Sequence, residues 1–209
     1  MTHKSTDPIK TINIDFKAIP EGERQATWVI INSVNDLVRY VEDFRAALRL
    51  SEFCKFLLSV NRTSIDYQKW CFIAGRDGVM TLYHFKKVLL YTQFKDCPTL
   101  IMRIDHERLK SARKTFNKEF HDVENMRHAV AHRGETWQTM GKHEKNSFSG
   151  SISLPGIKIK NSNNGIIQDT YVENNFYYTF KGRILSYELS DRTLNIVSGI
   201  AREYYNGFI

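Results

Sequence analysis

The residues best suited to chemistry lie close together near position 130 of this 209-residue sequence. Arg127 and Arg133 are permanent cations, and a guanidinium group offers a fixed fork of N–H donors that suits a phosphate. His128 and His132 can each donate or accept a proton near neutral pH. A helix C-terminus would also favour the charged form of such a histidine. These residue types at this spacing predict acid–base chemistry on a phosphate-containing substrate.

A helical wheel places the histidines opposite the apolar residues of the same segment. With Met126 at zero, the apolar stripe covers roughly 0–120°, whereas His121, His128 and His132 fall at about 200–240°. This face is a solvated polar surface, a metal site or an acid–base site. The sequence His-Ala-Val-Ala-His lacks the glutamate of H-E-x-x-H, and the nearby pattern offers no clear third ligand. We therefore expect no metal and no cofactor.

Arg127 and His132 do not share one direction on this wheel. They are separated by about 140° on an ideal helix. One straight helix would therefore aim the two side chains apart unless its last turn loosens or the arginine curls round. A dimer that pairs two copies of this helix would bring both residues to one cleft.

The pattern Arg127-x-x-x-x-His132, with polar His128 directly after the arginine near the end of a long helix, resembles the motif of the HEPN superfamily. The resemblance implies a dimeric helical bundle and metal-independent RNA cleavage by attack of the ribose 2′-hydroxyl on the adjacent phosphate. It also implies that Arg127 holds the phosphate and that His132 transfers protons. His128 would occupy the polar position beside the arginine.

Many proteins of this superfamily resemble ribonucleases of toxin–antitoxin and phage-defence systems. The resemblance therefore implies RNA as the substrate, a homodimer, and an antitoxin or regulatory protein as a further partner. Other members lack nuclease activity and bind a nucleotide, RNA or a protein. A catalytically inactive binding module remains the alternative, and a structural helical protein with a polar histidine surface is a third.

Other charged residues could support an RNA site. The 30 Lys and Arg residues exceed the 23 Asp and Glu residues, and the resulting net charge of +7 permits an anionic partner. Lys114 belongs to a basic flank of the predicted 105–132 helix and, with Arg133, could follow an RNA backbone. Asp77 could orient Arg127 or His132 from a facing helix. The alternative for Asp77 is a structural ion pair or a helix break.

The elements that must position these residues are predominantly helical. Apolar residues recur at three- and four-residue intervals, which predicts helices over residues 23–50, 63–94, 105–132 and 190–205. We expect a further short helix at 51–61, and Gly75 or Gly78 could interrupt the 63–94 helix. Gly134 is placed to end the 105–132 helix, and Ser190 to cap the last one.

Residues 145–189 differ in composition from the helical segments. They are rich in Ser, Asn and Gly and then in aromatic and β-branched residues, which predicts a small antiparallel sheet. Asn164-Gly165 is a hairpin-type turn sequence, and Lys181-Gly182 interrupts the aromatic run. The expected fold is mainly α: a HEPN-like bundle of four or five helices, with this β insertion before the C-terminal helix.

The rest of the sequence predicts the domain boundaries, the cellular location and the state of the cysteines. Residues 1–22 are expected to form an arm with a short strand around Ile12–Phe16, and residues 23–209 a single domain. A hydrophobic content of 42% excludes wholesale disorder. We expect no membrane span and no secretory signal, hence a cytoplasmic location. The odd count of three cysteines, without a C-x-x-C pair, predicts reduced, packed thiols.

Overall fold

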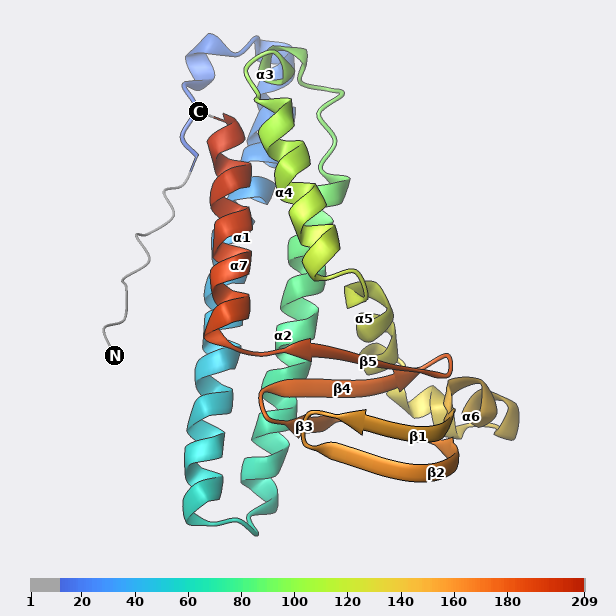
Figure 1. Ribbon diagram of the computed structural model, residues 1–209. Coiled ribbons are helices and arrows are strands. Elements are labelled where there is room, and N and C mark those ends of the chain that lie inside the picture. The colour runs from blue at the N-terminus through green and yellow to red at the C-terminus, as the bar shows by residue number, and fades with distance from the viewer. Residues whose placement is uncertain (1–11, 209) are drawn as a thin grey trace. The chain divides into compact units, whose positions relative to one another are not determined.

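The computed structural model describes residues 12–208, which contain seven α-helices and five strands (Figure 1). The helices are α1 (Glu21–Val60), α2 (Ile65–Tyr91), α3 (Pro98–Ile101), α4 (His106–Glu119), α5 (Val123–Ala131), α6 (Met140–Asn146) and α7 (Asp191–Tyr205). The strands are β1 (Phe148–Leu154), β2 (Ile157–Gly165), β3 (Thr170–Val172), β4 (Asn175–Phe180) and β5 (Arg183–Glu188). A mostly helical fold with antiparallel strands before the last helix is confirmed, but the expected count of four or five helices is too low.

The described chain divides into two compact units. The first contains the segments up to Glu42, Phe85–Glu119 and the residues from Asn195 onward. The second contains Asp43–His84 and Phe120–Leu194. The boundary falls within α1, α2 and α7, so three continuous helices contribute residues to both units.

The first unit is a packed group of helical segments. Phe85 of α2 stacks on Phe116 of α4 with ring centroids 5.6 Å apart, and both rings are fully buried. The Tyr205 hydroxyl of α7 donates a hydrogen bond of 2.9 Å to the Val34 carbonyl of α1. Each helix therefore buries the apolar side that the three- and four-residue spacing predicts.

The predicted helix over 105–132 is wrong as one element, because the chain forms α4 and α5 with a break at residues 120–122. Asp122 precedes α5, and its carboxylate lies 3.3 Å from the His121 ring. The apolar spacing continues through the break, so periodicity does not reveal it. The unit boundary falls at the same place. His121 consequently does not share a helix with His128 and His132.

Two other helix predictions also require correction. Residues 51–61 form no separate helix, since α1 continues to Val60. The helix α2 runs without interruption through Gly75 and Gly78. A Cβ at Gly75 would overlap the ring of Phe176, and a Cβ at Gly78 would overlap the hydroxyl of Tyr187. These glycines permit close packing of sheet aromatics against the helix instead of ending it.

The β insertion forms two antiparallel sheets, β1–β2 and β3–β4–β5. The Lys181-Gly182 turn is confirmed: it joins β4 to β5, with φ angles of 50° and 72°. The Asn164-Gly165 turn prediction is wrong, because Gly165 pairs with Phe148 at the end of β2. The turn between β1 and β2 lies instead at residues 155–156, where Gly156 has a φ of 70°.

A cluster of buried side chains joins α2, α5 and the three-stranded sheet in the second unit. Its buried members are Val79, Met126, Ala129, Phe176, Tyr178 and Leu185. The apolar side of α5 is thereby fixed against β4 and β5, and the exposed His128 lies on the same helix outside this cluster. Figure 1 shows α5 beside the ends of these strands, with α6 nearby.

The N-terminal segment differs from its prediction, whereas the cap of the last helix and the state of the cysteines agree with theirs. Residues 12–15 form no strand and lead into a short 3-10 helix, Phe16–Ala18, so the expected strand is wrong there; residues 1–11 of the predicted arm lie outside the described residues. The Ser190 hydroxyl accepts a hydrogen bond of 3.3 Å from the Thr193 amide and caps α7, as expected. All three cysteines are buried and free, also as expected. None of the described helices has the length and apolar character needed to cross a membrane.

Candidate functional site

A pocket of about 290 Å³ opens beside the C-terminal end of α5, within the second unit. Its walls come from α5, the following 3-10 helix Arg133–Trp137 (η2), α6, the end of β4 and the turn after it. The charged and titratable residues that line it are His128, His132, Glu135, Lys142, Lys145 and Lys181. Three lysines against one carboxylate make this a site suited to an anion.

The end of α5 brings His132 and Glu135 together. His132 is the C-cap residue, with φ −110° and ψ 24°, and its amide donates to the His128 carbonyl at 3.0 Å. The chain then tightens into η2, so a side chain three residues later returns to the same side. The His132 Nδ1 and Glu135 Oε1 atoms are 2.6 Å apart.

The carboxylate of Glu135 is held between two basic groups. Lys142 Nζ lies 3.4 Å from Glu135 Oε2, on the other side of the carboxylate from His132. The hydrogen bond to His132, with a smaller effect of Lys142, lowers the pKa of Glu135 below its usual value. Glu135 is therefore ionised at neutral pH and can orient the imidazole of His132.

The two predicted catalytic histidines lie next to each other in the pocket. The rings of His128 and His132 have centroids 6.0 Å apart and an interplanar angle of 24°. His128 is also nearly parallel to Phe180, at 7° and 6.5 Å. Both histidines are exposed, so each imidazole is accessible from solvent.

The lysines reach the pocket from two separate segments. Lys142 and Lys145 lie one turn apart on α6, and Lys181 lies in the turn between β4 and β5. The Lys181 amide donates a hydrogen bond of 3.1 Å to Asn146 Oδ1, which ties the turn to α6. Lys181 Nζ lies 5.1 Å from the centre of the Phe180 ring.

Arg127 is not among the residues that line this pocket. Its guanidinium carbon lies 5.0 Å from the centre of the Tyr83 ring of α2. Its Nε atom is buried without a hydrogen-bond partner among the described residues. Within one chain, the two ends of the Arg127-x-x-x-x-His132 pattern are thus directed to different places, as their separation on the wheel predicts.

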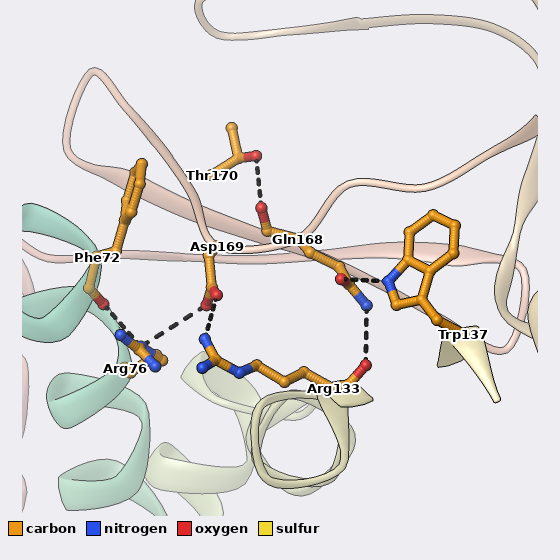
Figure 2. Close-up of polar contacts among 7 residues, drawn as sticks. All are labelled: Phe72, Arg76, Arg133, Trp137, Gln168, Asp169 and Thr170. Carbon is orange, nitrogen blue, oxygen red and sulfur yellow. Dashed lines mark hydrogen bonds and ion pairs between the residues drawn. The ribbon is translucent and has the colours of Figure 1, made fainter. Parts of the chain in front are cut away.

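Arg133 is engaged by an aspartate instead of facing the pocket. Figure 2 shows Asp169 between two guanidinium groups: Arg133 Nη1 lies 2.6 Å from Oδ2, and Arg76 Nε lies 3.7 Å from Oδ1. Asp169 has a φ of 46°, a left-handed conformation that aspartate tolerates better than most residues. Burial raises the pKa of the nearby Tyr178, and the charge of Asp169 raises it further.

The other two predicted residues, Asp77 and Lys114, do not line the pocket. Asp77 lies on α2, outside the pocket that contains His132. Burial, with a contribution from Asp43, raises the pKa of Asp77. Lys114 is exposed on α4, which belongs to the first unit.

Four charged residues of the pocket were not among the predicted site residues: Glu135, Lys142, Lys145 and Lys181. Glu135 was detectable, because it follows His132 by three residues at a predicted helix end. The lysines had no such signal, since only the tertiary structure brings α6 and the β4–β5 turn to α5. No group of three or more His, Cys, Asp or Glu residues within positions 12–208 is arranged to hold a metal ion.

Comparison of the chain with known protein families, with curated proteins and with solved structures gives no match.

Proposed function

We propose that the protein is a HEPN-like, metal-independent endoribonuclease whose cleavage site is the pocket at the end of α5. The observation that carries the proposal is the 2.6 Å contact between His132 and Glu135 in a pocket lined by three lysines. A carboxylate that accepts a hydrogen bond from Nδ1–H leaves Nε2 of the imidazole to act as a base.

In this mechanism, Nε2 of His132 removes the proton of the ribose 2′-hydroxyl. The 2′-oxygen attacks the adjacent phosphorus, and the bond from phosphorus to the 5′-oxygen of the next nucleotide breaks. Protonated His128 gives its proton to that leaving oxygen. The products are a 2′,3′-cyclic phosphate and a free 5′-hydroxyl, and no metal or oxidant takes part.

The lysines are the cations that bind the phosphate in this proposal. Lys145 and Lys181 line the pocket, whereas Arg127 packs on Tyr83. This differs from the resemblance-based expectation that Arg127 holds the phosphate. Preorganised cations stabilise the charge that develops on the phosphoryl oxygens in the transition state.

The wider biological proposal is a cytoplasmic toxin or phage-defence effector that forms a homodimer and is controlled by an antitoxin or regulatory protein. The motif supports the toxin or defence role.

The dimer has separate support, because the second unit exposes several large apolar side chains. They are Phe53, Phe56, Val60, Ile65, Trp70 and Ile73, from the C-terminal half of α1 and the N-terminal half of α2. Exposed apolar side chains in such number are typical of an interaction surface.

A catalytically inactive module that binds RNA, a nucleotide or a protein is the second candidate. The position of Arg127 outside the pocket favours it, because the motif's own cation does not reach the proposed cleavage site. A binding module and an enzyme would share the cationic pocket, so only a turnover measurement separates them.

The test is incubation of the full chain with a fluorescent single-stranded RNA in excess EDTA. We expect cleavage to cyclic-phosphate ends, and a rate for His132→Ala about 10²–10⁴-fold lower than that of the wild type. His121→Ala is the matched control, since this exposed histidine does not line the pocket and should leave the rate unchanged. Equal rates for His132→Ala and the wild type would refute the mechanism. Tight RNA binding without cleavage would establish the binding module.

A further inference from the structure

Trp137 is a large aromatic side chain left open to solvent on η2, one of the elements that line the pocket. It ends η2, and the preceding residue, Thr136, is part of the pocket lining. Its side chain is 62% exposed. Covering this apolar surface with a ligand would be favourable, because the surface otherwise remains in water.

The indole is held in one orientation. Its Nε1 donates a hydrogen bond of 3.0 Å to Gln168 Oε1, and Gln168 Nε2 donates one of 3.3 Å to the Arg133 carbonyl (Figure 2). Arg133 is in turn paired with Asp169. Both ends of η2 are therefore fastened to residues 168 and 169. A ring fixed through its edge keeps its π-face available at a small entropic cost on binding.

One neighbour already packs on the ring. The His143 imidazole of α6 lies with its centroid 5.0 Å from that of Trp137, at an interplanar angle of 41°. This contact adds a second constraint on the indole, while the residue as a whole stays largely exposed.

We infer that Trp137 is the stacking platform for an unpaired nucleobase and that the pocket therefore takes single-stranded RNA. This inference rests on the proposed function, since it names the substrate class of the same site. The cations of the pocket hold the phosphate, and the fixed ring holds the base of a nucleotide beside it. Every base has a π-face, so the platform is tolerant of sequence. Bases in a duplex are already stacked on one another and cannot reach the ring.

The experiment measures binding of a 2′-O-methyl RNA oligonucleotide, which cannot be cleaved because it has no free 2′-hydroxyl. We expect Trp137→Ala to weaken the binding of the single strand by about 5- to 150-fold, the range of one base–aromatic stack. Trp137→Phe should retain part of the affinity. Trp28→Ala is the matched control, because this indole is similarly exposed, at 58%, but belongs to the other unit. It should bind as the wild type does.

A second readout reports on the ring directly. In the Trp28→Phe, Trp70→Phe background, Trp137 is the only tryptophan of the three in the sequence. Its fluorescence should be quenched by the single strand. The same oligonucleotide annealed to its complement, or one with abasic sites, should quench little and bind more weakly.

The outcomes separate this inference from the proposed cleavage. Trp137-dependent binding without RNA cleavage would support the platform and refute the nuclease. Cleavage and binding that are unchanged in Trp137→Ala would overturn the platform and leave the nuclease intact. Equal affinity for single strand and duplex, or no oligonucleotide binding at all, would also overturn the platform.

Discussion

His132 and Glu135 are joined by a contact of 2.6 Å between Nδ1 and Oε1 at the point where α5 gives way to η2. The two residues are three positions apart in the sequence, whereas other residues of the pocket, such as Lys181, are distant from them in the sequence. The contact engages Nδ1 of the imidazole, and Nε2 is the nitrogen that acts as the general base in the proposed mechanism.

The first prediction concerns the titration of Glu135. The pKa of this carboxyl is lowered in the folded protein, so the contact with His132 is present above the usual glutamate pKa and is lost as pH falls through the lowered value. In His132→Ala, the midpoint of the Glu135 side-chain carbon signal in NMR should rise toward the usual value. Lys142→Ala should raise it less. An unchanged midpoint in His132→Ala would show that the pair does not form in solution.

The second prediction concerns the contact between Arg127 and Tyr83. A guanidinium 5.0 Å from a ring centre is a cation–π pair, so Arg127→Gln and Tyr83→Leu should be coupled by about 0.5–2 kcal/mol in a double-mutant cycle of unfolding free energies. Chemical denaturation provides the measurement. Tyr83→Leu combined with Lys158→Gln, at an exposed position on β2, should instead be additive. A coupling of zero would mean that Arg127 is free to point elsewhere.

The third prediction compares two glycines within helices. Gly75→Ala should lower the unfolding free energy by about 1–3 kcal/mol, because the new methyl group must displace the fully buried Phe176 ring. Gly199→Ala is the control, since a Cβ there meets nothing within 4 Å. It should raise the unfolding free energy by about 0.5–1 kcal/mol through helix propensity alone. Thermal and denaturant unfolding of both variants would decide the sign, and stabilisation by Gly75→Ala would contradict the helix–sheet packing.

The fourth prediction tests the proposed dimer. Phe56 is 63% exposed on α1, so Phe56→Glu places a charge on the apolar surface and should convert a dimer to a monomer in light scattering after size exclusion. Arg39→Glu, at an exposed polar position of the same helix, should leave the dimer intact. A monomeric wild type at high concentration would rule the dimer out.

Several elements were predictable because their causes are local. The apolar spacing along α1, α2 and α7 buries one side of each helix, and the Lys181-Gly182 turn follows from the left-handed conformation that its residues adopt. The Ser190 cap likewise depends on a hydroxyl and an amide three residues apart. Such features require only neighbouring residues, so the sequence shows them directly.

The break before α5 could not be predicted in the same way. The apolar residues of the 105–132 segment keep a helical spacing on both sides of it, and each side is buried in its own unit. Asp122, whose carboxylate binds Arg183 at 3.0 Å, precedes the new helix. That partner lies on β5, so the local sequence carries no sign of the contact.

For the candidate site, the residue types and the four-residue spacing of His128 and His132 determined which imidazoles lie on one side of a helix end. Only the tertiary structure decided what surrounds them. It brought Lys181 and Phe180 to the pocket from a distant hairpin, paired Arg133 with Asp169, and packed Arg127 on Tyr83. The physical reason is the distance over which each interaction acts. Helix periodicity and capping depend on residues within one turn. The packing of α5 against α2 and β4 depends on distant segments, and it determines which cationic side chains line the pocket.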